Sequence, residues 1–151
     1  MKLFPESDYS IELNNDSVFA ISELKKRTLS KEQFVANWNN QTFIGEINEN
    51  EFEIKLSKKL FGAFCVVNGK LDNRKGKLKI RTSKIFKIIF VVIVLFSLSG
   101  VIVAIAQNKL ELLFKVVMII LVMRFFFLEV GFRIASKYTL QKLTEIIGIR
   151  K

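Results

Sequence analysis

The chain contains no histidine, a single cysteine and a single proline among its 151 residues. Without histidine, histidine-based catalysis and histidine metal ligation are excluded. The lone thiol, Cys65, excludes an intramolecular disulfide and thiolate zinc sites, and it is consistent with a reducing compartment. Cys65 lies in the apolar segment Phe64–Val67, where a small buried side chain is a better interpretation than a nucleophile.

Other signatures of enzymes and exported proteins are also missing. There is no glycine-rich phosphate loop, no G-x-S-x-G motif and no carboxylate pair with catalytic spacing, and residues 1–6 lack the apolar core of a signal peptide. Four carboxylates near a predicted hairpin are interpreted as a solvated strand face, with a cation site as the alternative. They are Glu46, Glu49, Glu51 and Glu53. The sequence therefore predicts a protein that is not an enzyme, with no catalytic residue, cofactor or metal.

Two long apolar segments are the strongest positive signal. Residues 88–107 contain twenty uncharged residues, which at about 1.5 Å per residue match the ~30 Å hydrocarbon core of a bilayer. A second apolar segment, 112–132, follows after four residues. We expect a transmembrane hairpin with a first helix over 84–107, a turn over 108–111 and a second helix over 112–132. A buried core helix is the alternative for each segment.

The charge distribution predicts the orientation of this hairpin. The formal net charge is +10, but residues 1–74 carry a net −1 and residues 75–151 a net +11. The excess therefore flanks the apolar segments, as the positive-inside rule requires for cytoplasmic loops. We expect an integral protein of the cytoplasmic (inner) membrane with both termini cytoplasmic. Nucleic-acid binding is disfavoured, because aromatic side chains do not interleave with the cations.

Three groups of residues are predicted to interact with the membrane or within it. A basic run is expected to contact an anionic inner leaflet, and it comprises Lys75, Lys77, Lys79, Arg81, Lys84 and Lys87. Small residues on one face of the first span predict close helix packing, against the second span or a second copy, and they are Ser97, Gly100 and Ala104. The second span contains three ionisable residues, namely Lys115, Arg124 and Glu129. For these we favour snorkelling and local pairing, with ion conduction as the alternative.

The remaining segments predict a small cytosolic α+β part. In residues 1–41, Tyr9–Leu13 alternates like a strand, and Val18–Arg27 has the pattern of a helix, with a two-strand hairpin as the alternative. A capping box at Ser30–Gln33, followed by Phe34 and Trp38, predicts a second short helix.

Residues 42–83 predict an antiparallel β-meander. The four strands are expected at Thr42–Ile47, Glu51–Ser57, Phe64–Leu71 and Lys77–Arg81. The turn between the third and fourth strands is expected at Asp72–Gly76, and Asn68-Gly69, within the third strand, is the alternative turn.

Residues 133–151 predict a C-terminal helix. Its apolar stripe is expected to pack on the sheet, with an interfacial membrane helix as the alternative. The stripe comprises Leu140, Leu143, Ile146 and Ile147. The predicted fold class is thus an α+β membrane protein with a small antiparallel β-meander, flanking helices and a two-helix transmembrane hairpin.

One resemblance concerns residues 42–107. The segments Phe43–Ile47, Phe52–Ile54, Val66–Leu71 and Gly76–Ile80, followed by a membrane span, resemble a group of small bacterial membrane proteins. In that group a pattern F-x-G-x-I, F-x-I, G-x-I precedes a transmembrane hairpin. The resemblance implies an integral membrane protein with a β-rich cytosolic part, and it implies neither an activity nor site residues.

Together these features predict a non-enzymatic integral membrane protein that presents a small interaction or regulatory module at the inner leaflet. An adaptor, an accessory subunit or an immunity-type protein would fit. The expected partners are the bilayer and either another protein or further copies of the chain. The alternative is a small oligomerising effector that permeabilises or depolarises the membrane.

Overall fold

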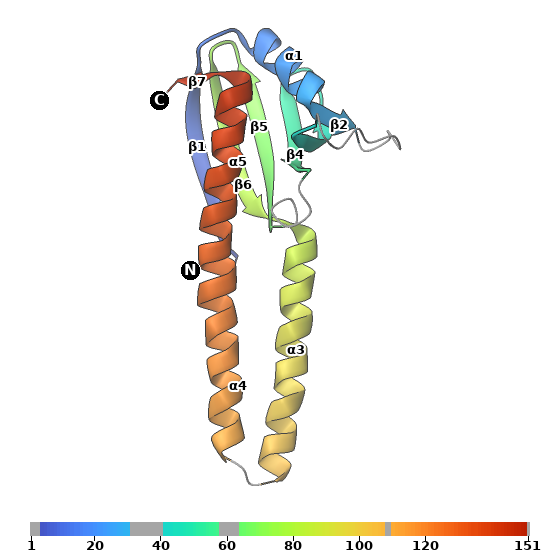
Figure 1. The fold of residues 1–151 in the computed structure, drawn as a ribbon, viewed down its shortest axis with the longest axis vertical. Coiled ribbons are helices and arrows are strands. Elements are labelled where there is room, and N and C mark those ends of the chain that lie inside the picture. The colour runs from blue at the N-terminus through green and yellow to red at the C-terminus, as the bar shows by residue number, and fades with distance from the viewer. Residues whose placement is uncertain (1–3, 31–40, 58–63, 108–109, 151) are drawn as a thin grey trace.

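The computed structural model describes residues 4–30, 41–57, 64–107 and 110–150. Figure 1 shows two parts: a curled sheet with helices packed on it, and two long helical arms that extend side by side from one end of that sheet. The α+β class is therefore confirmed.

The sheet has seven strands in the order β2-β3-β4-β5-β6-β1-β7. The predicted meander is present as its four central strands, each antiparallel to the next. The prediction of a purely antiparallel meander is too simple, because β1 pairs with β6, β7 pairs with β1, and β2 runs parallel to β3. The strands are β1 (Glu6–Leu13), β2 (Thr28–Ser30), β3 (Phe43–Ile47), β4 (Glu51–Leu56), β5 (Cys65–Asp72), β6 (Lys75–Thr82) and β7 (Ile149–Arg150).

The turn between β5 and β6 lies at Asn73 and Arg74, as the sequence predicts. Asn73 has φ of 51°, a left-handed conformation that asparagine tolerates better than most residues. The alternative turn at Asn68-Gly69 is wrong, because both residues lie within β5. A Cβ on Gly69 would overlap the ring of Phe52, so this glycine makes room for an aromatic side chain on the neighbouring strand.

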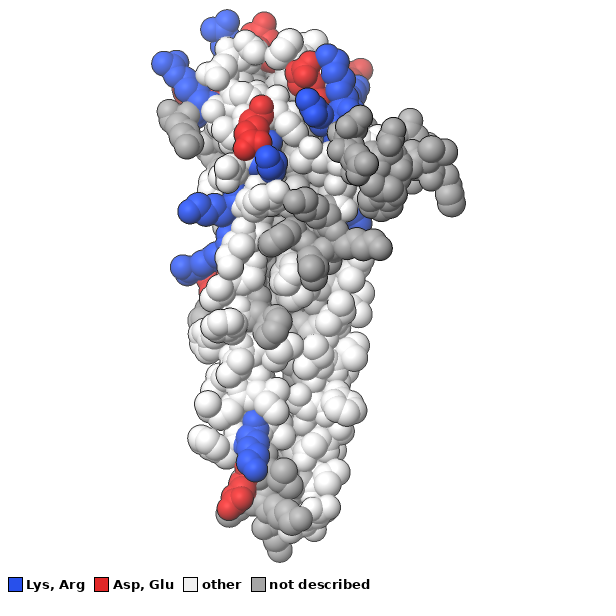
Figure 2. Space-filling model, viewed as in Figure 1, with Lys and Arg blue, Asp and Glu red and all other residues white. Residues whose placement is uncertain are grey.

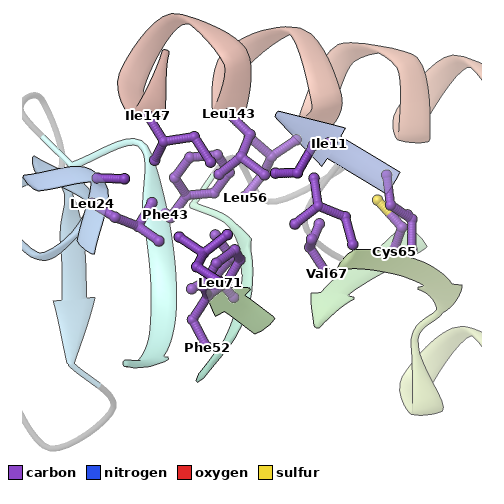
Figure 3. Packing of buried hydrophobic residues seen from close by; sticks show 14 of the residues in the cluster. Ile11, Leu24, Phe43, Phe52, Leu56, Cys65, Val67, Leu71, Leu143 and Ile147 are labelled. Carbon is purple, nitrogen blue, oxygen red and sulfur yellow. The ribbon is translucent and has the colours of Figure 1, made fainter. Parts of the chain in front are cut away.

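Two helices cover one face of the sheet and close the core. They are α1 (Ser17–Arg27) and α5 (Gly131–Ile147). Figure 3 shows Leu24 of α1 and both Leu143 and Ile147 of α5 pointing toward Phe43 and the other buried strand residues. The predicted helix at Val18–Arg27 is therefore confirmed, and the C-terminal stripe packs on the sheet.

The two arms are helical, but they are not two equal α-helices. The first is α3 (Lys84–Ala106). The second begins as α4 (Leu110–Val122), continues as the π-helix η1 (Met123–Val130) and leads without a break into α5. Thirteen residues of α-helix span only about 20 Å, so α4 by itself is too short for a bilayer. The predicted second span over 112–132 does not form one regular α-helix, so a hairpin of two membrane-spanning helices is not supported. The predicted boundary at 132/133 is not a break in the helical path.

Two expectations fall outside the described residues. The capping-box helix was expected to begin at Ser30, which here ends β2, and its remaining residues lie in 31–40. The predicted turn 108–111 is described only from Leu110 onward, where α4 begins.

We expect Leu143→Ala to lower the free energy of unfolding by about 2–5 kcal/mol, because Leu143 is fully buried between α5 and the sheet. The measurement is urea denaturation of the detergent-solubilised chain. The control is Gln141→Ala, an exposed position on the same helix, with an expected change below about 0.5 kcal/mol. Equal effects of the two changes would contradict the packing of α5 on the sheet.

Candidate membrane-interaction site

The surface of the helical arms is apolar and exposed. Among the described residues, α3 is the helix that is long and apolar enough to cross a membrane, over Lys84–Val103, and only 6% of its apolar window is buried. A core helix of a soluble protein can have the same composition, but it is mostly covered by the rest of the chain. Phe96 is 80% exposed, and Ile102 and Phe114 are each 70% exposed. Figure 2 shows the arms as largely uncharged, with charged side chains gathered around the sheet and near the far tip.

The two arms pack against each other through a small residue. A Cβ on Gly100 would lie 3.6 Å from Cγ2 of Val116, so Gly100 faces α4 at ordinary van der Waals distance. Gly100 thus faces the second arm of the same chain, and packing of the whole small-residue face within a membrane remains a prediction. Ser97 is half-buried and its hydroxyl donates to the Ile93 carbonyl at 2.8 Å within α3. The side chain of Ala104 lies outside the description.

Aromatic contacts join both arms to the sheet. The rings of Phe64 and Phe86 lie 4.4 Å apart, and a Cβ on Gly131 would lie 3.0 Å from the Phe64 ring. The Phe64 carbonyl accepts a hydrogen bond from the Ser83 amide at 3.0 Å. Ser83 in turn caps α3, because its hydroxyl accepts from the Phe86 amide at 3.2 Å. These contacts fix where α3 leaves the sheet and where the second arm joins α5.

Two of the six predicted membrane-contacting cations lie at the start of α3. Lys84 is exposed in the first turn. The ammonium of Lys87 lies 5.2 Å from the centre of the Phe4 ring, a cation–π distance. The Phe4 ring also meets Phe90 edge-on, with 5.8 Å between centroids. An aromatic ring and a cation thus lie together at the boundary between the charged and the apolar surface.

The other four cations project from β6 on the face of the sheet opposite the core. The register places Lys75 opposite Glu12, Lys77 opposite Ser10, Lys79 opposite Asp8 and Arg81 opposite Glu6. On the other side of β6, the Arg81 guanidinium lies 2.9 Å from a Glu53 oxygen. Lys79 and Arg81 therefore form ion pairs with carboxylates of β1 and β4, whereas Lys77 lies opposite a serine.

Distance also separates the β6 cations from the apolar arms. Strand β6 runs from the β5–β6 turn toward α3, as Figure 1 shows. With a rise of about 3.3 Å per residue, Lys75 lies roughly 30 Å from the start of α3, whereas Arg81 lies only roughly 10 Å from it. The Debye length at physiological salt is about 8 Å, so the charge of Lys75 is largely screened from a membrane surface around α3, and that of Arg81 much less so. Lys84 and Lys87 therefore lie nearest to the apolar arms, and membrane contact by any of the six cations remains a prediction.

The π-helix brings Arg124 and Glu129 together. Five residues correspond to a rotation of about 500° in an α-helix, which would put the two side chains on different faces. The wider π-helix, with its i→i+5 hydrogen bonds, returns residue i+5 to nearly the same face. Nη1 of Arg124 lies 3.6 Å from Oε2 of Glu129, and Nη2 of Arg133 lies 3.2 Å from Oε1 of Glu129. Glu129 thus bridges two arginines, and snorkelling of Arg124 in a membrane remains a prediction.

Arg124 is the more buried partner in this bridge. Its side chain is 16% exposed, against 37% for Glu129 and 76% for Arg133. Its Nη1 is buried without a hydrogen-bond partner in the described residues, so the ion pair with Glu129 is its main compensation. Lys115, the third predicted ionisable residue, is exposed near the start of α4.

The thiol of Cys65 and the clustered carboxylates are engaged in contacts within the fold. Cys65 is fully buried with its Sγ 3.4 Å from the Thr139 hydroxyl, and burial raises the pKa of its thiol, which keeps it protonated and unreactive at neutral pH. A shallow depression of ≈ 350 Å³ on the outer sheet face is lined by three of the clustered carboxylates. Glu51 accepts from Lys70 at 2.7 Å, and Glu53 accepts from Asn68 and Arg81. Within the described ranges, no group of side chains is arranged to hold a metal ion.

Comparison with known proteins adds no relative: no protein family model, curated protein or solved structure matches this chain.

Two features of this site were missed in the sequence. The first is the acidic strand that faces β6, which was readable as alternate polar residues in the segment Glu6–Leu13. The second is the π-helix, for which the five-residue spacing between Arg124 and Glu129 inside an apolar segment was the available signal. Both depend on partners that only the folded chain brings together.

The Arg124–Glu129 pair is expected to stabilise the second arm. In a double-mutant cycle of Arg124→Met and Glu129→Gln, we expect a coupling energy of about 1 kcal/mol, because Arg124 is mostly shielded from water. The measurement is the unfolding free energy in detergent micelles. The matched control is the exposed pair on α5, Lys142→Met with Glu145→Gln, expected at about 0.3 kcal/mol. Coupling in the first cycle no larger than in the second would contradict a role for the π-helix in building this pair.

Proposed function

We propose that this chain is a non-enzymatic integral membrane protein whose helical arms cross the bilayer and hold the sheet module at the cytoplasmic leaflet. The observation that carries the proposal is the exposed apolar surface of α3, directly adjoining a charged sheet module. Soluble monomers rarely expose contiguous apolar patches larger than a few hundred Å². Hydrocarbon is the environment in which such a surface is stable.

The second crossing would consist of α4 and η1 together. They run continuously from Leu110 to Val130 and lie along α3, with Val116 against Gly100. The arms are antiparallel, so counting forward from Val116 corresponds to counting back from Gly100. Eight residues along, Arg124 lies about level with Val92. By the same count Glu129 lies level with Lys87. The guanidinium of Arg124 thus reaches out of the apolar layer toward a carboxylate at the predicted membrane boundary, which is snorkelling guided by the π-helix.

The charges at the two ends of the arms support the orientation. Lys84 and Lys87 begin α3, and the exposed Arg133 and Lys137 follow η1 at the same end. At the opposite end, the cation of Lys115 is balanced by Glu111 one turn earlier. The positive-inside rule then places the sheet module and both termini in the cytoplasm.

The module itself is best understood as an interaction or regulatory element. Its one thiol is buried, its outer carboxylates are engaged by cations, and its described surface offers a shallow charged face rather than an enclosed pocket. An adaptor, an accessory subunit or an immunity-type protein would use such a face to bind another protein near the membrane.

Single-cysteine labelling tests the topology. In a Cys65→Ala background, we expect a membrane-impermeant maleimide to label Gln107→Cys at the end of α3 in intact cells, and Gln141→Cys on α5 only after the cells are opened. Ser97→Cys, in the middle of α3, is the control that should stay unlabelled in both conditions. Release of the protein by an alkaline carbonate wash would refute membrane insertion, and labelling of Gln141→Cys in intact cells would refute the orientation.

One observation favours a second candidate, an oligomerising effector that depolarises the membrane: a mostly buried arginine lies within an apolar arm. Overexpression with a potential-sensitive dye separates the two. Under our proposal, wild type and Arg124→Leu leave the membrane potential unchanged, and a pore-forming toxin serves as the positive control. Depolarisation by wild type that Arg124→Leu abolishes would establish the effector and overturn the adaptor.

A further inference from the structure

Strand β1 has an open edge. On one side it pairs with β6 over seven residues, Glu6 to Glu12. On the other side, β7 pairs only with Glu12 and Leu13. Among the described residues, no strand pairs with the β7-side edge of β1 below Glu12. The opposite edge strand of the sheet is β2, which is only three residues long. Such a short edge strand offers few backbone groups for pairing with another chain.

The hydrogen bonds of Leu13 and Asn14, at the end of β1, show which backbone groups of the strand face the open edge. The Leu13 amide donates to the Arg74 carbonyl on the β6 side, and the Asn14 amide donates to the Gly148 carbonyl on the β7 side. Successive residues of a strand direct their backbone groups to opposite neighbours. Asp8 and Ser10, an even number of residues before Asn14, therefore direct their N–H and C=O groups toward the open edge.

We propose that this edge binds an extended segment of another membrane protein: a basic, alternating stretch that lies on the cytoplasmic side just before a transmembrane helix. The segment adds antiparallel to β1 below β7. This inference rests on the proposed function, because it requires the sheet module to stand at the cytoplasmic surface of the bilayer.

The pairing of β7 shows which side chains fit. Arg150 lies opposite Glu12 on the outer face, and Ile149 lies opposite Leu13 on the core side, where it packs against the buried cluster. Continuing this alternation, the bound segment places a cation opposite Ser10 and Asp8 and an apolar residue opposite Tyr9. Tyr9 itself packs on the core, so an apolar neighbour there extends the buried surface. Opposite charges across a strand pair add about 0.2–1 kcal/mol each.

Strand β6, which pairs with the other side of β1, already has the sequence pattern proposed for the bound segment. It places Lys79 and Arg81 outward against Asp8 and Glu6, buries Leu78 and Ile80, and then leads into α3. A strand in the open position would have the same direction as β6, toward the membrane. Cytoplasmic flanks of membrane spans are rich in lysine and arginine, so many membrane proteins can supply this pattern.

A second copy of this chain fits the edge poorly. Antiparallel pairing of β1 with β1 would bring the outward carboxylates of Glu6, Asp8 and Glu12 in one strand against those in the other. Like charges on directly opposed residues destabilise a strand pair, so the edge selects a basic partner over its own copy.

The test uses the full chain in an uncharged detergent and a fluorescent peptide with the β6 sequence Gly76–Thr82. We expect saturable binding by fluorescence anisotropy. A peptide with every Lys and Arg replaced by Glu should not bind. A peptide N-methylated at alternate backbone amides keeps its charge but loses the strand hydrogen bonds, and it should bind roughly tenfold more weakly.

Variants of the protein locate the peptide. Asp8→Lys is expected to weaken binding by roughly fivefold or more, whereas Asp16→Lys, the same charge change at an exposed site away from the edge, leaves it unchanged. Circular dichroism and the urea midpoint confirm that each variant is folded. If N-methylation has no effect, or if both variants weaken binding equally, edge pairing is overturned in favour of non-specific charge attraction.

This outcome is separable from that of the proposed function. Loss of peptide binding with intact membrane topology would remove the edge site alone. Failure of the cysteine-labelling experiment would remove the membrane partner, even if the peptide still bound the isolated protein.

Discussion

The position of one aromatic ring determines how the two parts of the molecule are joined. Phe64 contacts Phe86 at the start of α3 and Gly131 at the start of α5, and its carbonyl holds the Ser83 amide that begins the first arm. Both arms therefore leave the sheet from the same point. Gly131 allows this close approach, because a Cβ there would lie 3.0 Å from the Phe64 ring. The side-by-side arms, the level of Glu129 relative to Lys87 and the distance of β1 from the apolar surface all depend on this junction.

Local patterns predicted most of the fold. Alternation at β4 and β6 and the Asp72–Gly76 turn predicted the central strands, and the helical pattern of Val18–Arg27 predicted α1 with its end at Arg27. The remaining features depend on long-range pairing. The two residues of β7 carry no pattern of their own and form a strand only because β1 lies beside them. The parallel pairing of β2 likewise depends on where α1 delivers the chain.

The site was harder to predict than the fold because its charges act in pairs. Read along the sequence, the cations of β6 form a single basic run, yet in the sheet they alternate with carboxylates from β1 and β4. Similarly, Arg124 and Glu129 would lie on separate faces of an ideal α-helix, and the local widening of η1 changes that relation. The spacing of small residues in α3 was a better guide, since Gly100 meets its partner within the same hairpin.

The pairing of β7 with β1 also determines the order in which the protein can be completed during synthesis. β1 precedes both arms in the chain and β7 follows them, so both arms emerge from the ribosome between the two paired strands. The core between α5 and the sheet stays open until the residues beyond the hairpin have been translated. Both helical arms are therefore translated in full before α5 can close the core on the sheet.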